Sequence, residues 1–332
     1  GTLKSSNIGF RCAWSEGSTH EAVRGDIEAA EDIERVAAPP AISPAAPTPI
    51  PLLDGLVNPT GLTRLGNSWI VADSGMGLVW QAPDDGANAE VVLEGLGEPT
   101  ALVASQGAVW IIDSAQSQVL RWEAAADEAS VVCTLPEPPV HLAADEQGLL
   151  VASETAVYDA GTDPPTTVME GLDGVGAIAL RDGFLYVTVL GSSNLANAQI
   201  LRSTRDGGGV GAIVGQNILQ NVFYVPAITW KDSTGEMIFP VVRDGWPYSG
   251  VIAHISASNQ LVIGTHGPPG MKWVQATDNG LIVGCTDTLI RVTDNAPYSV
   301  IASWTAPSAI DVDEQGRVVW LDGKSGTLYR SE

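Results

Sequence analysis

The sequence predicts an all-β protein, a seven-bladed β-propeller of four-stranded antiparallel blades spanning residues 49–332. Three observations predict it. The 332 residues include 36 Gly and 21 Pro, a mix that suits short strands joined by tight turns. One short pattern recurs seven times along the chain. Each repeat of about 40 residues contains four strand-like runs, which is typical of a propeller blade.

The recurring pattern is a turn followed by a small residue and then an aliphatic residue. Its third positions lie 40, 40, 36, 50, 46 and 36 residues apart, and every fourth position is Leu, Ile or Val. Small residues are expected here because the innermost strands of seven blades converge on a narrow axis. The seven copies are Pro59–Leu62, Pro99–Leu102, Pro139–Leu142, Val175–Ile178, Val225–Ile228, Met271–Val274 and Pro307–Ile310.

The strands of each blade are separated by Gly-, Asn- and Asp-containing turns. In the first repeat we expect strands at Gly61–Leu65, Ser68–Ala72, Gly77–Gln81 and Glu90–Glu94. The last repeat supplies only three, at Ser308–Val312, Arg317–Leu321 and Gly326–Arg330.

Residues 49–56 are expected to supply the missing strand of the last blade. They contain the run IPLLDGL, which matches the fourth-strand runs VVLEGL and TVMEGL of other repeats. Pairing this segment with the C-terminal strand would remove the exposed sheet edges of an unfinished ring. The sequence therefore predicts that an N-terminal strand closes the propeller.

Two segments precede the propeller. Residues 15–48 are acidic, then rich in Ala and Pro, which predicts a linker with few large apolar side chains. Residues 1–14 include SSNIGFRC from Ser5 to Cys12. This run resembles the C-terminal end of formylglycine-generating-enzyme (sulfatase-modifying-factor) domains. The resemblance covers about a dozen residues, implies that the chain is the C-terminal part of a longer protein, and transfers no catalytic residue.

The charge of the chain bears on its partners. With 39 acidic and 16 basic residues the formal net charge is −23. Such a surface repels the phosphate backbone, so nucleic acid is not an expected partner.

No apolar run reaches the roughly 18–20 residues of a transmembrane helix. The three cysteines lack zinc-site spacing, and Cys133 and Cys285 follow apolar runs that predict burial.

Two repeats share a run at the end of the predicted second strand. It reads IVADSG from Ile70 to Gly75 and IIDS from Ile111 to Ser114. This motif resembles the corresponding segment of NHL-type and lactonase-like propellers. That group contains scaffolds, sugar lactonases and a streptogramin-cleaving lyase. The resemblance implies the fold but does not choose among these functions.

Long connections cluster in the fourth to sixth repeats. In a propeller, the connection between the second and third strands shares a face with the link to the next blade. Four such segments are predicted there, at 190–197, 216–225, 243–249 and 265–269. Their aromatic and amide side chains suit a carbohydrate or protein ligand. The predicted ligand-binding residues are Asn194, Asn197, Tyr224, Arg243, Asp244, Trp246, Tyr248, Lys272 and Trp273.

Two functional hypotheses follow. The first is a non-catalytic binding propeller, extracellular or periplasmic in a bacterium, which presents this face to a protein or carbohydrate and needs no cofactor. The second is a lactonase- or lyase-like hydrolase that uses His141 and His266 with a calcium or magnesium ion at the central channel. His141 and Trp273 occupy positions that hold Gly or Ala in the other five repeats. A histidine can serve as a general base or metal ligand, and more often it is a hydrogen-bonded core residue.

Overall fold

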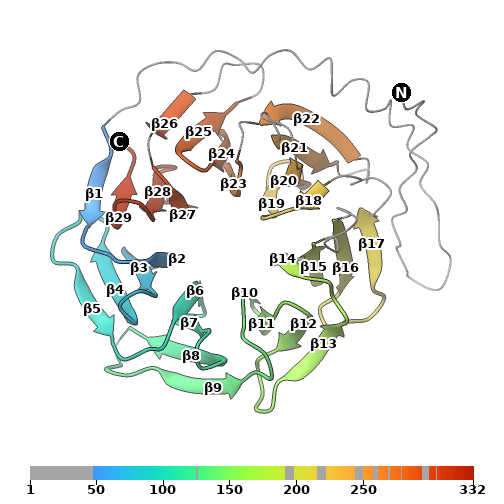
Figure 1. The fold of residues 1–332 in the computed structure, drawn as a ribbon, viewed down its shortest axis with the longest axis horizontal. Helices are drawn as coiled ribbons and strands as arrows, with labels where there is room; N and C mark the ends of the chain where they lie inside the picture. The colour runs from blue at the N-terminus through green and yellow to red at the C-terminus, as the bar shows by residue number, and fades with distance from the viewer. Residues whose placement is uncertain are drawn as a thin grey trace. The chain divides into compact units, whose positions relative to one another are not determined.

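The protein is an all-β seven-bladed propeller, as predicted (Figure 1). The computed structural model describes residues 48–332 except 125, 191–197, 215–221, 244–249, 257–260, 268–269, 278, 294–298 and 304. The predicted remnant (1–14) and nearly all of the linker (15–48) therefore lie outside the described residues.

The described residues form short strands and no helix. In chain order the strands are β1 Ile50–Leu53, β2 Pro59–Leu65, β3 Ser68–Asp73, β4 Leu78–Pro83, β5 Glu90–Leu93, β6 Pro99–Ser105, β7 Ala108–Asp113, β8 Gln118–Glu123, β9 Ser130–Thr134, β10 His141–Asp145, β11 Gly148–Ala152, β12 Ala156–Asp159, β13 Thr166–Glu170, β14 Val175–Arg181, β15 Phe184–Val189, β16 Gln199–Thr204, β17 Gly211–Val214, β18 Val222–Tyr224, β19 Thr229–Lys231, β20 Glu236–Arg243, β21 Gly250–Ile255, β22 Leu261–Gly267, β23 Trp273–Thr277, β24 Gly280–Gly284, β25 Thr288–Val292, β26 Ser299–Ser303, β27 Pro307–Val312, β28 Val318–Asp322 and β29 Thr327–Arg330.

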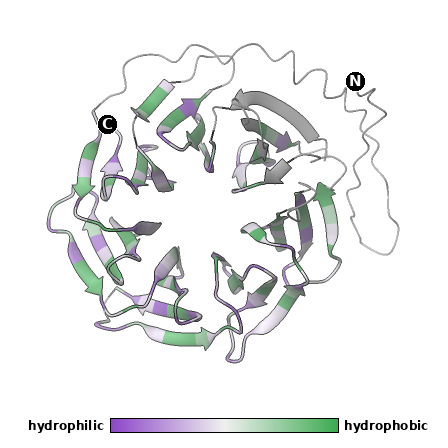
Figure 2. Cartoon of the chain, viewed as in Figure 1, coloured by the Kyte–Doolittle hydropathy of each residue, from purple (hydrophilic) through white to green (hydrophobic). Residues whose placement is uncertain are grey.

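Seven sheets follow one another along the chain, and we number them as blades. Six consist of consecutive strands: blade 1 (β2–β5), blade 2 (β6–β9), blade 3 (β10–β13), blade 4 (β14–β17), blade 5 (β18–β22) and blade 6 (β23–β26). Blade 7 has the order β1-β29-β28-β27 and so joins the two ends of the described chain. Figure 2 shows hydrophobic residues along the strands and hydrophilic residues at many of the turns.

The chain divides into two compact units. One includes blades 4 and 5, and its core contains Ile200, Val225 and Phe239. The other includes blades 1, 2, 3 and 7. Its core lies between successive blades, with Trp69 among the residues that face β1 and blade 7, and Trp122 between blades 1 and 2. The predicted burial of Cys133 and Cys285 is confirmed.

The first strands of neighbouring blades approach closely, which explains their small residues. A Cβ atom added to Gly61 would lie 3.1 Å from Leu102 Cγ and 3.2 Å from Ala101 Cα in the next blade. The Thr60 hydroxyl donates a hydrogen bond across the same gap to the Pro99 carbonyl, at 2.8 Å. A larger side chain at position 61 would push the two strands apart.

The closing strand β1 pairs with β29 as predicted. Ile50 lies opposite Arg330 and Leu53 opposite Leu328. Leu52 and Leu53 are 3% and 8% exposed, and both join the core between blades 1 and 7. After β1 the backbone N–H of Leu56 donates to the Gly326 carbonyl at 2.9 Å. The seventh blade is therefore completed by apolar burial as well as by a strand ladder.

The inner strand of blade 5 departs from the prediction. The pattern Val225–Ile228 does not open a strand; β18 and β19 flank it, and both pair with β20. Pro226 lies in the break, and Pro240 is among the β20 residues opposite it. Neither proline has an N–H to donate, so a continuous ladder is unfavourable here.

Two of the four predicted connections are also corrected. Residues 222–224 of the predicted link 216–225 form β18. Residues 265–267 of the predicted loop 265–269 extend β22, where His266 lies opposite Val251 and Gly267 opposite Gly250. Val262 and Ile263 favour a strand, and a register shift between Val251 and Ala253 lets the pairing continue past Gly264.

Leu52→Ala should lower the free energy of unfolding by about 2–5 kcal/mol, because it leaves a cavity where β1 meets blades 1 and 7. Leu52→Met keeps the volume and should cost less than about 1.5 kcal/mol. Urea denaturation followed by tryptophan fluorescence measures both. Equal stability of the alanine variant and the parent chain would show that β1 does not close the propeller.

Candidate functional site

Five of the nine predicted ligand-binding residues lie outside the described residues; they are Asn194, Asn197, Asp244, Trp246 and Tyr248. The other four have defined positions at or beside strand ends. Tyr224 ends β18, and Arg243 ends β20. Lys272 is exposed directly before β23, and the half-buried Trp273 begins that strand.

Two kinds of connection meet at one edge of each blade, which we call the loop edge. One joins the second and third strands of a blade, and the other links the fourth strand to the next blade. In blades 1 and 2 they hydrogen-bond directly: Leu96 N–H donates to the Gly77 carbonyl at 3.1 Å, and Leu135 N–H to the Ser117 carbonyl at 2.8 Å. This arrangement is the one predicted from the repeat.

A buried aspartate organises the loop edge of blades 1, 2 and 7. Asp73, Asp113 and Asp322 each end a second strand and are at most 5% exposed. The Asp73 carboxylate accepts hydrogen bonds from the N–H groups of Val57 and Asn58, both at 2.9 Å, on the link that enters blade 1. We call each such aspartate, with the four-residue connection after it, an aspartate turn.

Asp113 repeats both contacts with the incoming link, and Asp322 accepts one hydrogen bond from the link and one from its own turn. Asp113 accepts from the N–H groups of Gly97 and Glu98, at 2.7 and 2.9 Å. Asp322 accepts from the N–H groups of Ala306 and Lys324, both at 2.9 Å. The sequence motif that recurs at the end of the second strand thus contains a structural aspartate. Its carboxylate oxygens accept hydrogen bonds from backbone N–H groups.

Opposing effects set the pKa of Asp322. Burial raises the pKa of its carboxyl group, but the hydrogen bonds from Ala306, Lys324 and Ser325 favour the ionised form more strongly. The pKa therefore lies below its ordinary value. The carboxylate is charged at neutral pH and holds the turn in its ionised form.

Blade 3 builds the same edge with a hydroxyl group. Ser153 follows β11 and is fully buried, and its Oγ accepts from the N–H groups of Thr155 and Ala156. The Glu137 carboxylate, from the preceding link, accepts from the Thr155 hydroxyl at 2.7 and 2.9 Å. Hydrogen bonds from Ser153 and Thr155 lower the pKa of Glu137.

The second strands of blades 4 and 5 do not end in an aspartate. Val189 pairs with Val175 in the register position that Asp73 has opposite Pro59, and Arg243 ends the second strand of blade 5.

The connections between the second and third strands also differ in length among the blades. Four residues follow Asp73, Asp113 and Asp322, whereas nine (190–198) follow β15 and six (244–249) follow β20. The link 215–221 from blade 4 to blade 5 has seven residues. The fourth predicted segment shrinks to a five-residue link, 268–272, no longer than those before β2 and β6.

The two candidate catalytic histidines occupy different places in their blades. His141 is half-buried and begins β10, the first strand of blade 3. His266 lies on β22, the fourth strand of blade 5. First strands of a propeller line its centre and fourth strands its periphery. The convergence of both histidines on one metal ion stays a prediction.

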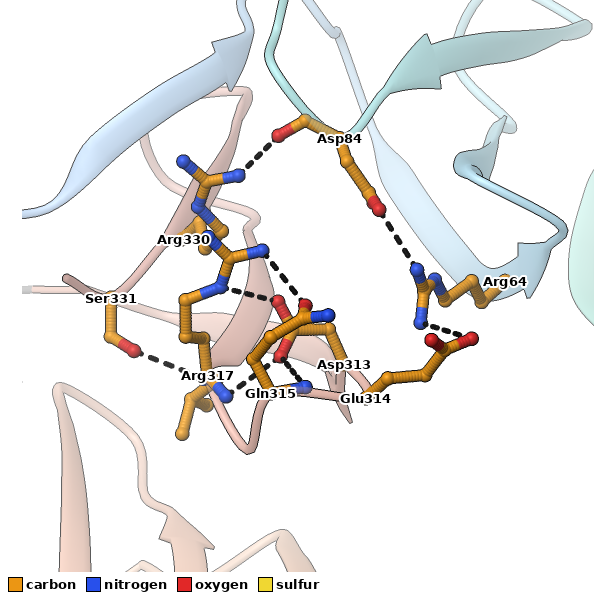
Figure 3. Close-up of polar contacts among 9 residues, drawn as sticks. Arg64, Asp84, Asp313, Glu314, Gln315, Arg317, Arg330 and Ser331 are labelled. Carbon is orange, nitrogen blue, oxygen red and sulfur yellow. Dashed lines mark hydrogen bonds and ion pairs between the residues drawn. The ribbon is translucent and has the colours of Figure 1, made fainter.

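An ion network occupies the opposite edge of blades 1 and 7 (Figure 3). Arg64 of β2 contacts Asp84 at 2.8 Å and Glu314 at 3.3 Å. Arg317 contacts the buried Asp313 at 2.6 Å, and Arg330 of β29 donates to the Asp84 carbonyl. These partly buried cations are engaged with partners from two blades and therefore support the closure.

Other candidate chemistry is limited in the described part of the chain. No group of three or more His, Cys, Asp or Glu side chains is placed there to hold a metal ion. Burial raises the pKa of Cys133 to about 11 and that of Cys285 to about 12, so both thiols remain protonated at neutral pH. Over the same residues no helix is long and apolar enough to cross a membrane.

Solved structures resemble this chain in fold. No family model and no curated protein sequence matches it. YCF48 bound to a D1 peptide is 13% identical, with 89% of this chain and 99% of that chain covered and a TM-score of 0.66. Hydrazine synthase of Kuenenia stuttgartiensis is 10% identical, with 84% and 96% covered and a TM-score of 0.66. A gluconolactonase of Xanthomonas campestris is 14% identical, with 89% and 94% covered and a TM-score of 0.55.

These likenesses show the fold alone. The chain is a seven-bladed β-propeller that resembles both a peptide-binding propeller and lactonases. The resemblance of residues 5–12 to formylglycine-generating enzymes gains no support from the comparisons.

Asp322→Asn should lower the free energy of unfolding at neutral pH by about 1–3 kcal/mol, because the amide offers one acceptor and no charge to the donors around it. Asp54→Asn is the matched control, since Asp54 is exposed. Denaturation of the three proteins at neutral pH measures the difference, and equal losses for both variants would contradict the role of the carboxylate.

The pH dependence tests the same carboxylate separately. A lowered folded-state pKa contributes stability that is fully present above the unfolded value of about 3.9. That stability is lost as the pH falls through the folded pKa. The gap between the parent chain and Asp322→Asn should therefore narrow on acidification below about pH 4. A gap that stays constant down to acid unfolding would exclude an ionic contribution.

Proposed function

We propose that the protein is a non-catalytic binding propeller, exported to an extracellular or periplasmic location. It presents the loop edge of blades 4–6 to a protein or carbohydrate partner. The observation that carries this proposal is the change in that edge between blades. Aspartate turns hold four-residue connections in blades 1, 2 and 7, whereas the second strands of blades 4 and 5 end in Val189 and Arg243 and are followed by connections of nine and six residues.

The aspartate turn matters because its carboxylate fixes the backbone of a four-residue connection. Its carboxylate satisfies the N–H groups of the incoming link and of the turn itself, such as Asn58 and Gly75 around Asp73. A backbone held in this way is suited to packing. A hydrophobic Val189 imposes no such arrangement, so blade 4 can carry an insertion at no cost in buried hydrogen bonds.

The composition of the inserted segments supports a ligand of mixed polarity. Residues 190–198 contain two asparagines, and residues 244–249 contain Trp246 and Tyr248. Aromatic faces pack on sugar rings or apolar side chains, and amides pair with hydroxyl or peptide groups. YCF48, which resembles this chain in fold, has been determined with a bound peptide. A propeller of this architecture can therefore serve as a binding module.

Trp246→Ala with Tyr248→Ala should abolish partner binding, because it removes the aromatic surface from the 244–249 connection. The full chain is screened on a glycan array and, by crosslinking mass spectrometry, against an extracellular protein fraction. Met76→Ala is the control; Met76 is 49% exposed in the aspartate turn of blade 1. Binding that survives the double substitution, or is lost equally in the control, would contradict the assignment.

A hydrolase is the second candidate, and His141 is the observation that favours it. This half-buried histidine stands on a first strand at the position of Gly61 and Ala101 in blades 1 and 2. If it acts as a base or ligand for calcium or magnesium, His141→Ala should abolish lactone cleavage that a chelator also inhibits. His254→Ala serves as the control. A chain without chelator-sensitive lactonase activity would exclude this candidate.

A further inference from the structure

A groove of about 920 Å³ lies between the outer strands of blades 1 and 2. One side is β5 of blade 1, and the other is the hairpin from β8 to β9 of blade 2. Its lining includes Leu93, Leu120 and Trp122, which are 6%, 5% and 2% exposed. The groove thus lies directly over the buried core between the two blades, against which the partly buried Val92, Leu96 and Ala129 also pack.

The hairpin side of the groove is open because its side chains are small. Ala124, Ala126 and Ala129 line it. The indole N–H of Trp122 donates to the Ala126 carbonyl at 2.9 Å and holds the hairpin in position. The backbone of the hairpin, held by this hydrogen bond, therefore defines the groove on this side.

The strand on the other side ends its sheet. β5 pairs with β4 through Leu93, Val91 and Glu90, and in the described topology no strand pairs with its other edge. Val91 is 40% exposed. Edge strands offer unpaired N–H and C=O groups on which an extended segment can form an additional strand.

The charges around the groove are of one sign. Glu90 and Glu94 flank the β5 side, Asp127 and Glu128 stand on the hairpin side, and all four are exposed. Among the described residues that line the groove none is Lys or Arg. A second copy of this chain, with its net charge of −23, is therefore repelled, and a cationic segment is attracted.

We propose that this groove binds an extended basic segment of a partner protein, which adds to β5 as a further antiparallel or parallel strand. Side chains of such a strand alternate in direction. Apolar side chains on one face contact the partly buried Val92, Leu96 and Ala129 of the lining, and lysine or arginine side chains reach Glu94 and Glu128. The backbone supplies the pairing, and the four carboxylates select the partner.

The test uses the full chain and a fluorescein-labelled peptide of about six residues with alternating lysine and valine. Fluorescence anisotropy should show saturable binding that weakens as salt is raised. Glu94→Lys with Glu128→Lys should weaken binding by about tenfold or more. Glu146→Lys with Glu154→Lys makes the same change in net charge at exposed sites outside the groove and should change binding by less than about twofold.

Two further peptides separate the parts of the proposal. A peptide with glutamate in place of lysine should not bind, and one with N-methylated amides should bind at least about tenfold more weakly because it cannot complete the ladder. Failure of the lysine peptide to bind, equal binding by the glutamate peptide, equal effects of the two double variants, or undiminished binding of the methylated peptide would each overturn the proposal. Thermal unfolding of both double variants confirms that they are folded.

Discussion

The pairing of β1 with β29 is the constraint on which the propeller depends. Ile50 and Arg330 are partners although 280 positions separate them, and loop-closure entropy rises only with the logarithm of that separation. The register shift between Pro51 and Leu53 has a packing consequence. Consecutive side chains of a regular strand point to opposite faces, but Leu52 and Leu53 both reach the core between blades 1 and 7. One short strand therefore stabilises two blades.

The aspartate turns extend the same principle to successive blades. Asp73 belongs to blade 1, yet its donors Val57 and Asn58 come from the link that leaves β1 of blade 7. Each turn thus connects a blade to the link that precedes it, through hydrogen bonds from backbone N–H groups to a buried aspartate side chain. This connection restricts the loop edge of blades 1, 2 and 7. Variation is consequently expected in the connections that follow strands ending in Val189 and Arg243.

The sequence predicted the number of blades, the closing strand and the positions of most strands, because small residues, turns and apolar alternation are local signals of packing. It failed at Val225–Ile228, where Pro226 and a proline on the opposite strand interrupt the ladder. The structural role of Asp73 was also not predicted, because the motif from Ile70 to Gly75 was interpreted only as a family resemblance. The recurrence of an aspartate at three second-strand ends was the available signal. The outer groove was not predictable, because its space depends on how two blades pack.

The acidity of this chain has two physically different parts. The carboxylates of Asp73, Asp113 and Asp322 are buried against backbone donors, so dissolved salt screens their interactions weakly. The carboxylates of Glu94 and Glu128 are exposed beside an unpaired strand edge, where salt screens them strongly. The first group maintains the fold and the second repels or selects partners. The fold should therefore tolerate changes in ionic strength that alter recognition.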